Sequence, residues 1–541
     1  MNKFLQQATN LSGSNLSRTE NGALTFNTTG STLVDQFGTA GSFRGRKLYD
    51  VFGDQKTLDQ FNRRDAVKFL FYLRGITRNY EDLGLNKGQG ARDEAFKRLL
   101  FYVYEDPSVF YNNLGLMTFV GSFRDVWDII VLAQQNNISL DYDRIFELYS
   151  LALNSNQRDL ALKYLPSIQA KSKIKTDRAR IRNNVAKRFA AYLGLTPKTY
   201  RQLKTEGQAH NWQKAISVGE VLAVNFDRIP GRALSRLVGS KFLKNQGLET
   251  AYDKWLQSKP VAKFTGYAYE LGDKLIHATK PYQLMTINKQ FDGLIKLMQD
   301  SSEELENVWP VVDTSGSMNS GTAGGSTTAL NVAKSLAIYF SSLNTGAFKD
   351  QVVMFNRTCK LLQLKGNFAD KYRQFPGNAM GNTNFQSVID LLAKTRRNNP
   401  DIPVEDYPTT LLVVSDLQFD PTETRYDAYL GRRNLNVLTA RNIKTNHEAM
   451  MDKLRGYFPN WYINKLKVVW WNVTDRVNDT FHSTNEDGGT YYVSGFDGSV
   501  ITNILGGDDV VDERTGKVRQ PTAEERVQAA LSQPVYELVN A

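Results

Sequence analysis

The sequence predicts a protein of two parts, an all-α array of helices in the style of HEAT repeats followed by an α/β domain with a doubly wound, Rossmann-like sheet. Before about residue 305, apolar residues recur at three- and four-residue spacing, which is the period of amphipathic helices. After residue 306, short apolar runs alternate with amphipathic helices, which favours a parallel sheet covered on both faces. The length of 541 residues leaves room for about three to four domains, and 41% hydrophobic and 23% charged residues are typical of a globular chain.

Residues 1–55 are predicted to form an extended N-terminal arm, because the beginning of the chain is rich in Ser, Thr, Asn and Gly. Residues 56–305 are predicted to form the helical array. Short Gly, Pro and Asn breaks separate amphipathic segments such as LDQFNRRDAVKFLFYLRGI, GARDEAFKRLLFYVYED and DYDRIFELYSLALNS. Stacked helix pairs of this kind bury their apolar stripes against their neighbours. No strict sequence repeat is present, so the array is HEAT-like in style only.

Residues 306–508 are predicted to form the α/β domain. The segments NVWPVVD, TTLLVVSDLQF and KVVWWNV are apolar runs with the length of buried strands, and TTALNVAKSLAIYFSSLN is an amphipathic helix. Trp470 and Trp471 lie in one of these strands and are expected to be packing residues, as are most aromatic residues of the helical region. Residues 509–541 form a C-terminal tail in which PTAEERVQAAL predicts a helix with Pro near its start.

The formal net charge of +11 is unevenly distributed along the chain. Residues 1–300 contain 43 Lys and Arg against 28 Asp and Glu, whereas residues 301–541 contain 24 against 28. A basic excess confined to one region suggests a polyanionic partner for that region; the alternative is that the basic surface only improves solubility.

Several classes of protein are excluded by composition. A single cysteine, Cys359, allows no internal disulfide and no thiolate zinc cluster, and four scattered histidines argue against a histidine-rich metal site. No apolar run approaches the ~20 residues that span a bilayer, and MNKFLQQATN lacks a signal-peptide core. We therefore expect a cytoplasmic protein, located in the host cytoplasm or in the virion if the protein is viral.

Polar residues follow two predicted strands and open one predicted helix. Asp313, Ser315 and Ser317 follow the first strand of the α/β domain, Asp416 follows a later strand, and Thr383 precedes a helix. In a doubly wound sheet, these segments converge at the carboxyl edge. Their hydroxyl and carboxylate oxygens suit a hard octahedral cation, Mg²⁺ first and Mn²⁺ second. A serine-rich turn that caps a helix is the structural alternative, and it leaves Thr383 and Asp416 unexplained.

The same five residues, in the same order, resemble the metal-ion-dependent adhesion site (MIDAS) of von Willebrand factor A (vWA) domains. The resemblance implies that Ser315 and Ser317 bind the metal directly, and that Thr383 binds it directly or through water. Asp313 and Asp416 would act mostly through water and as charge balance. An acidic group of a protein partner would take the remaining position of the metal.

A helical array followed by a C-terminal vWA domain resembles the TROVE class, which includes the Ro ribonucleoprotein autoantigen. This resemblance implies that the array closes into a ring, that its basic surface binds small structured RNAs, and that the hole accepts single-stranded RNA ends. A family of vWA proteins from plants, fungi and large bacterial viruses is similar at the level of motifs. The shared motifs are TENGALTFNTTGS, LRG, ALKYLP, VVWWNV and YYVSGFDGSV.

A dense basic segment, KSKIKTDRARIRNNVAKR, covers residues 171–188. Arg178 and Arg182 are four residues apart and would share a helix face. An intracellular cluster of this density is a candidate for contacts with a phosphate backbone; the alternative is a solvated helix face. The candidate RNA-binding residues are Lys171, Lys173, Lys175, Arg178, Arg180, Arg182, Lys187, Arg188, Arg201 and Lys204.

The sequence does not favour an enzyme. It lacks a G-x-x-x-x-G-K-[ST] phosphate loop, and its few histidines offer no Ser/His/Asp or Cys/His set. Metal-assisted hydrolysis by Asp313 and Asp416 is the weakest hypothesis, because no additional general base is evident. The favoured function is an RNA-binding ribonucleoprotein scaffold with a metal-dependent adhesion site for an acidic protein partner. The alternatives are a protein-only adaptor, for example for a MoxR-type AAA+ ATPase, and a virion-associated structural protein of a bacteriophage.

Overall fold

The protein was analysed as a computed structural model, and its chain divides into two compact units. One unit comprises residues 1–45 and 256–530, and the other comprises residues 46–255 and 531–541. We refer to them as the α/β unit and the helical unit. The structure describes residues 15–541 except 42–44, 77, 207–223, 241, 246, 265, 301–305, 323–326, 423–443, 475–479, 486, 497, 499–508 and 512–517.

The helical unit is a succession of helices with one short hairpin. Its described elements are α3 (Leu48–Phe61), α4 (Arg63–Arg74), β3 (Arg78–Tyr80), β4 (Gly84–Asn86), α5 (Arg92–Glu105), α6 (Pro107–Val120), α7 (Arg124–Gln135), α8 (Tyr142–Leu153), α9 (Arg158–Tyr164), α10 (Asp177–Tyr192), α11 (Pro197–Glu206), α13 (Gly231–Gly239), α14 (Phe242–Asn245) and α15 (Glu249–Gln257), the last of which spans the boundary between the units.

Local sequence explains where these helices begin. The side chains of Asn62, Asp106, Asp141 and Thr176 each accept a hydrogen bond from a backbone N–H in the first turn of the helix that follows. Such caps satisfy backbone donors that have no partner inside the helix. At the start of α6, Pro107 occupies a position where its missing N–H is not needed.

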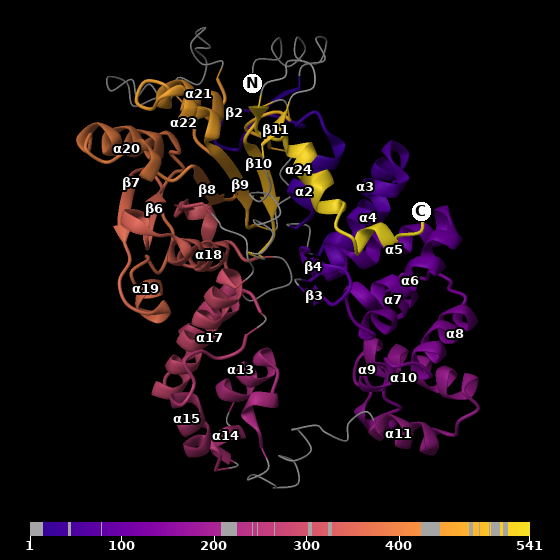
Figure 1. The fold of residues 1–541 in the computed structure, drawn as a ribbon. Coiled ribbons are helices and arrows are strands. Elements are labelled where there is room, and N and C mark those ends of the chain that lie inside the picture. Colours follow the sequence, from indigo (N-terminus) through magenta and orange to yellow (C-terminus); the bar gives the residue numbers. More distant parts are fainter. Residues whose placement is uncertain are drawn as a thin grey trace. The chain divides into compact units, whose positions relative to one another are not determined.

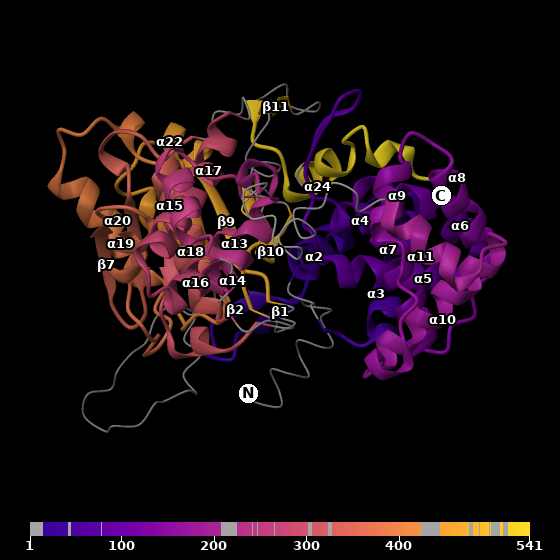
Figure 2. The same ribbon diagram turned by 90° about the horizontal axis from the view of Figure 1, so that it is seen from below.

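From α3 to α11, most helices of the helical unit pack on the helix next to them in the chain or on the one after it (Figures 1 and 2). Helices α7, α8 and α10 share an aromatic core in which the rings of Trp127, Tyr149 and Phe189 lie 4.4 to 5.5 Å apart, centroid to centroid. The last residues of the chain also belong here, because the ring of Tyr536 packs on that of Tyr72. The predicted all-α array is therefore confirmed.

The α/β unit is built around one sheet. Its described elements are β1 (Leu16–Arg18), β2 (Leu24–Phe26), α2 (Thr32–Ala40), α16 (Ala268–His277), α17 (Pro281–Gln299), β5 (Val308–Asp313), α18 (Ala329–Leu343), β6 (Gln351–Phe355), β7 (Cys359–Gln363), α19 (Phe368–Arg373), α20 (Gln386–Asn398), β8 (Thr410–Ser415), α21 (Asn446–Leu454), α22 (Asn460–Lys465), β9 (Lys467–Asn472), β10 (Thr490–Ser494), β11 (Val510–Val511), β12 (Val518–Arg519) and α24 (Ala523–Leu531).

The six strands of the central sheet have the order β10-β9-β8-β5-β6-β7. All neighbours are parallel except β6 and β7, which form an antiparallel pair at one edge. Counted from β5 as the first strand, this is the doubly wound order 3-2-1-4-5-6. The predicted Rossmann-like fold class is confirmed, and the order reverses between β5 and β8, where such sheets bind ligands.

Helices cover both faces of this sheet. Trp470 and Trp471 are adjacent in β9, so their side chains point to opposite faces, and both are fully buried. The Trp471 ring lies 6.1 Å from that of Phe340 in α18, whereas the Trp470 ring packs beside His447 of α21 and Phe385, which precedes α20. The expectation that both tryptophans are packing residues is confirmed.

The structural division differs from the predicted domain boundaries, and residues 15–41 are no simple extended arm. They form the hairpin of β1 and β2 and the helix α2, and α2 packs on β10 (Figure 2). The Thr19 hydroxyl donates to the Phe419 carbonyl at 2.7 Å, and the backbone N–H of Gly41 donates to Ser494 Oγ at 2.7 Å. These contacts bridge about 400 residues of sequence and assign the segment to the α/β unit.

The predicted boundary at residue 305 also differs from the structure, in which the α/β unit already resumes at residue 256. Helices α16 and α17 were assigned to the array because of their helical period, yet they pack on α18 and belong to the α/β unit. The predicted tail also divides: α24 lies in the α/β unit except for its last residue, Leu531, and residues 531–541 belong to the helical unit. None of the helices in the described part of the chain is long and apolar enough to cross a membrane.

Candidate metal centre and nucleic-acid interface

Backbone hydrogen bonds hold together the three loops that carry the predicted metal ligands. The Met380 N–H donates to the Thr314 carbonyl at 2.8 Å, and the Gly316 N–H donates to the Gly381 carbonyl at 3.1 Å. The loop after β8 joins them, because the Asp420 N–H donates to the Thr383 carbonyl at 2.9 Å. The loops therefore meet at the carboxyl edge of the sheet, at the switch point between β5 and β8.

Asp313, the last residue of β5, is fully buried and fixed at both carboxylate oxygens. Its Oδ1 accepts from the Ser315 N–H at 2.7 Å, and its Oδ2 accepts from the Ser415 hydroxyl at 2.5 Å. The hydroxyl oxygens of Ser315 and Ser317 lie 3.2 Å apart. One buried carboxylate and two adjacent hydroxyls thus converge at the end of β5.

The second carboxylate, Asp416, is also fully buried and lies next to Asp313. The pKa of Asp313 is raised to about 7: burial contributes most, the negative charge of Asp416 adds to it, and the hydrogen bonds from Ser415 and Ser315 oppose both effects. Two buried like charges repel each other strongly in a medium of low dielectric constant. A divalent cation would replace this repulsion with attraction to both groups.

The residues at this edge fit a hard cation. Among the described residues, no group of three or more His, Cys, Asp or Glu could hold a metal ion, so a cation here depends on hydroxyl oxygens and two carboxylates. That donor set suits Mg²⁺, which keeps part of its water shell. Thr383 is buried beside the same loops, and its carbonyl is bonded to the loop that follows Asp416. The structure brings all five predicted residues to one edge.

The predicted basic segment contributes to a compact charged group in the helical unit. Asp128 of α7 is 3% exposed at its side chain, and guanidinium groups surround it. Its Oδ1 accepts from Arg178 at 2.8 Å and from Arg182 at 2.7 Å, both in α10. Its Oδ2 is contacted by Arg92 of α5 and, at 3.2 Å, by Arg124 of α7. We call Arg92, Arg124, Arg178 and Arg182 the arginine cluster.

A second buried carboxylate supports the arginine cluster. Asp125, fully buried in α7, accepts from Arg92 at 2.9 Å and from Arg74 of α4 at 2.6 Å. Burial would raise the pKa of Asp128, but the four arginines lower it below its usual value. Burial lowers the pKa of Arg182, Asp128 raises it, and the positive charges of the other three cluster arginines lower it. The arginines therefore repel one another around a single acceptor.

The remaining predicted cations do not form one surface with the arginine cluster. Residues in an α-helix are about 100° apart, so Arg180 and Lys187 lie on the face of α10 opposite Arg178. Arg180 pairs with Asp177 at the start of the same helix, and Lys187 is exposed. The guanidinium of Arg188 stacks on a tyrosine ring, 3.8 Å from its centroid.

Two predicted cations have structural contacts. Lys204 donates to the Leu165 carbonyl, and Arg201 donates to the Ile168 carbonyl at 3.4 Å. Burial, with a smaller contribution from Arg182, lowers the pKa of Lys204 to about 8. The other three predicted cations precede α10, two of them in a 3-10 helix of residues 171–173: Lys173 and Lys175 are exposed, and the side chain of Lys171 is outside the described side chains.

Sequence reasoning missed Arg92, Arg124 and Arg74. They precede the basic segment by about 50 to 100 residues and stand in ordinary amphipathic helices. One signal in the sequence could have indicated them. Asp125 and Asp128 lie one turn apart in α7, on the face that also carries buried apolar residues. Buried carboxylates require cationic or hydrogen-bonding partners.

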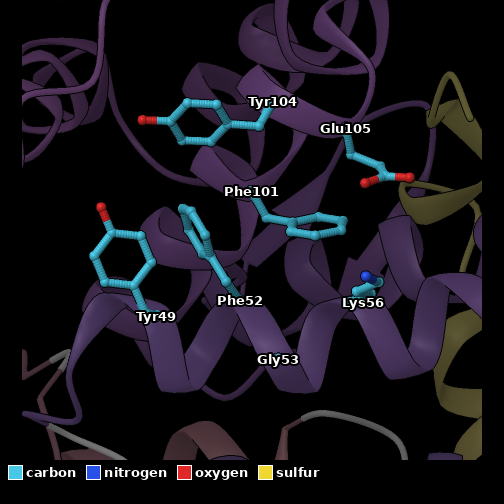
Figure 3. A pocket seen from close by; sticks show the side chains of 7 residues that line it. All are labelled: Tyr49, Phe52, Gly53, Lys56, Phe101, Tyr104 and Glu105. Carbon is cyan, nitrogen blue, oxygen red and sulfur yellow. The ribbon is translucent and has the colours of Figure 1, made fainter.

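The helical unit also carries exposed aromatic residues, although most aromatics of the helical region were expected to be core residues. Tyr49 and Tyr104 are 67% and 60% exposed. With Phe52 and Phe101 they border a shallow pocket of about 510 Å³ between α3 and α5, and their rings face this space in Figure 3. The full lining consists of Tyr49, Phe52, Gly53, Lys56, Phe101, Tyr104 and Glu105.

Comparisons with known proteins give a family match for part of the chain. Residues 307–538 match the family model described as "Domain of unknown function (DUF7788)". The chain is 24% identical over 537 residues to "Uncharacterized protein L728" of Acanthamoeba polyphaga mimivirus, a match that covers 92% of this chain and 85% of the relative. Among solved structures, the Ro (RSR) protein of Deinococcus radiodurans is similar, with a TM-score of 0.39 and 14% identity over 94% of this chain and 99% of that protein.

Proposed function

We propose that the protein binds RNA and that the helical unit holds the phosphate groups. The observation that carries this proposal is the distribution of charge between the units. The helical unit has 34 Lys and Arg against 23 Asp and Glu, which equals the whole net charge of +11, whereas the rest of the chain has 33 of each. Residues 158–204, which contain α9, α10 and α11, have 13 basic residues against two acidic ones.

A charge distribution of this kind supports binding to a polyanion through its backbone. Lysine and arginine side chains that neutralise phosphates release condensed counterions, and this release supplies most of the affinity of sequence-independent binding. Phosphate contacts position a nucleic acid without reading its bases. We therefore propose recognition of RNA by backbone and shape, with little dependence on sequence.

The test compares RNA with another polyanion. The full chain is purified and its ultraviolet absorbance ratio is measured, and its affinity is then determined by fluorescence anisotropy for single-stranded RNA and for polyglutamate. We expect copurified nucleic acid and clearly tighter binding to RNA. A clean protein spectrum together with equal or weaker binding to RNA would contradict the proposal and leave the basic surface a contribution to solubility.

We further propose that the edge of the sheet at Asp313 and Asp416 binds Mg²⁺ or Mn²⁺ and thereby an acidic group of a protein partner. The observation that favours this function is the convergence of two buried carboxylates with the hydroxyls of Ser315 and Ser317 at the switch point of the sheet. When bound, the cation would supply an open coordination position for an external carboxylate. The chain's own contribution is to fix the oxygens, as the hydrogen bonds to Asp313 do.

Calorimetric titration with Mg²⁺ and Mn²⁺ tests the metal site. Ser317→Ala removes one hydroxyl of the pair and should weaken cation binding, because that hydroxyl is a proposed direct ligand. Ser320→Ala is the matched control, since Ser320 lies three residues further along the same loop and is not among the proposed ligands. Equal cation binding by the two variants and the unmodified protein would contradict the assignment.

A further inference from the structure

The arginine cluster carries more positive charge than its surroundings neutralise. The four cluster guanidiniums, with Arg74, carry five positive charges, and the two carboxylates that they contact, Asp128 and Asp125, carry two negative ones. No other carboxylate contacts these five arginines in the described part of the chain. Three positive charges therefore remain unmatched within one small region.

The cluster also retains hydrogen-bond donors. A guanidinium has five N–H groups, yet Arg124 reaches Asp128 through Nε alone and Arg178 through Nη2 alone. Arg182 uses Nη2, and its Nε is buried without an acceptor among the described residues. The half-exposed Arg124 and Arg178 therefore keep N–H donors that a ligand entering from solvent can use.

We propose that the arginine cluster, arranged around the buried Asp128 carboxylate, binds the terminal phosphate of an RNA strand. The proposal rests on RNA binding by the helical unit and specifies which part of the RNA this site takes. Asp128 acts as a positioning residue, because it holds guanidiniums from α5, α7 and α10 in one place. Arginine side chains bind phosphate oxygens through paired, charge-assisted hydrogen bonds.

A terminal phosphate fits this site better than an internal one for two reasons. A phosphomonoester carries close to two negative charges at neutral pH and so matches three unmatched positive charges more closely than a singly charged phosphodiester. It also presents three free oxygens, whereas an internal phosphate presents two. Arg124 of α7 and Arg178 of α10, which are half exposed, together retain enough N–H groups to approach all three oxygens.

The exposure of the cluster agrees with a ligand that enters from solvent. The side chains of Arg178 and Arg124 are 50% and 48% exposed, whereas those of Arg92 and Arg182 are 32% exposed and lie deeper. A phosphate at the exposed side would contact the first pair directly, and the second pair would strengthen the local positive potential.

The experiment measures the affinity of the full chain for short single-stranded RNAs of one sequence that end in a 5′-phosphate, a 3′-phosphate or hydroxyls only. We expect one terminal phosphate to increase affinity by about tenfold or more, as a paired charge-assisted contact would. Arg124→Gln and Arg178→Gln should abolish this preference. Arg180→Gln is the matched control on the same helix and should keep it, because Arg180 lies on the opposite face and pairs with Asp177.

The outcomes separate the site from the underlying function. Salt-dependent RNA binding with equal affinity for all three ends would overturn the terminal-phosphate site and leave RNA binding intact. Absence of RNA binding would overturn both. Inorganic phosphate and a phosphoserine peptide serve as competitors, and a peptide that binds more tightly than the phosphorylated RNA would also overturn the proposal. If Arg180→Gln lost the preference while Arg124→Gln and Arg178→Gln kept it, the phosphate would bind on the opposite face of α10, and the proposal would be overturned.

Discussion

Asp128→Asn tests whether the arginine cluster depends on one carboxylate. The substitution keeps the size of the side chain and removes the charge that four guanidiniums share. Loss of one partner from a buried ion pair is unfavourable by about 3–5 kcal/mol. The arginines are between a third and a half exposed, so water compensates part of this loss. We expect the free energy of unfolding of the helical unit to fall by about 3 kcal/mol.

Hydrogen exchange of the full chain in urea is the appropriate assay, because it reports α7 and α10 separately from the α/β unit. Asp177→Asn is the control, since Asp177 is 51% exposed and pairs with Arg180, three residues away. The free energy of unfolding should fall by less than about 1 kcal/mol in this control. Phosphate in the buffer should restore part of the stability of Asp128→Asn, because it replaces the missing anion. Equal losses in the two variants, or no effect of phosphate, would refute the reasoning.

Three further predictions concern the α/β unit. Burial lowers the pKa of His482 to about 3, so the unfolded chain takes up a proton below about pH 6.5 while the folded chain does not. Stability in urea should therefore fall with decreasing pH between these values, by up to ~1.4 kcal/mol per pH unit. Gly41→Ala places a Cβ 2.2 Å from the Ser494 carbonyl and should destabilise the unit by more than ~2 kcal/mol in urea. Gly377→Ala, in open space within the same unit, should be neutral or stabilising. Asp313→Asn should abolish the increase in melting temperature that Mg²⁺ gives the unmodified protein, as measured by calorimetry.

Each of these predictions has a contradicting result. A slope of stability against pH that is unchanged in His482→Gln would show that this histidine is not protonated selectively in the unfolded chain. An unchanged free energy of unfolding in Gly41→Ala would show that α2 does not pack closely on β10. A full Mg²⁺ effect in Asp313→Asn would show that the cation binds elsewhere.

The strands of the sheet were predictable because their signal is local. β5, β8 and β9 are short apolar runs between polar turns, which is the pattern of strands buried on both faces. The polar residues at their carboxyl ends were predictable for the same reason, since the parallel topology alone brings Asp313 and Asp416 to one edge.

The N-terminal hairpin and the arginine cluster were not predictable in this way. The hairpin strands are only three residues long, which is too short for a clear pattern in the sequence. The position of the hairpin depends on tertiary contacts such as the hydrogen bond from the Thr19 hydroxyl to the Phe419 carbonyl. In the basic segment, helical periodicity correctly placed Arg178 and Arg182 on one face, but periodicity does not reveal the partner of that face. Asp128 is some 50 residues away, and only the packing of α7 on α10 brings it there.

The dependence of RNA affinity on salt tests the central claim most directly. The full chain is compared with Lys173→Gln/Lys175→Gln, which removes two exposed cations from the basic segment, and with Lys349→Gln/Lys360→Gln, which removes two exposed cations from the neutral α/β unit. Each phosphate contact to a single strand contributes about 0.7 to the slope of log affinity against log salt. RNA binding through the helical unit predicts that the slope decreases in magnitude by about 1.4 in the first variant, which loses two such contacts, and is unchanged in the second. A slope near zero for the unmodified chain, or an equal decrease in both variants, would contradict it.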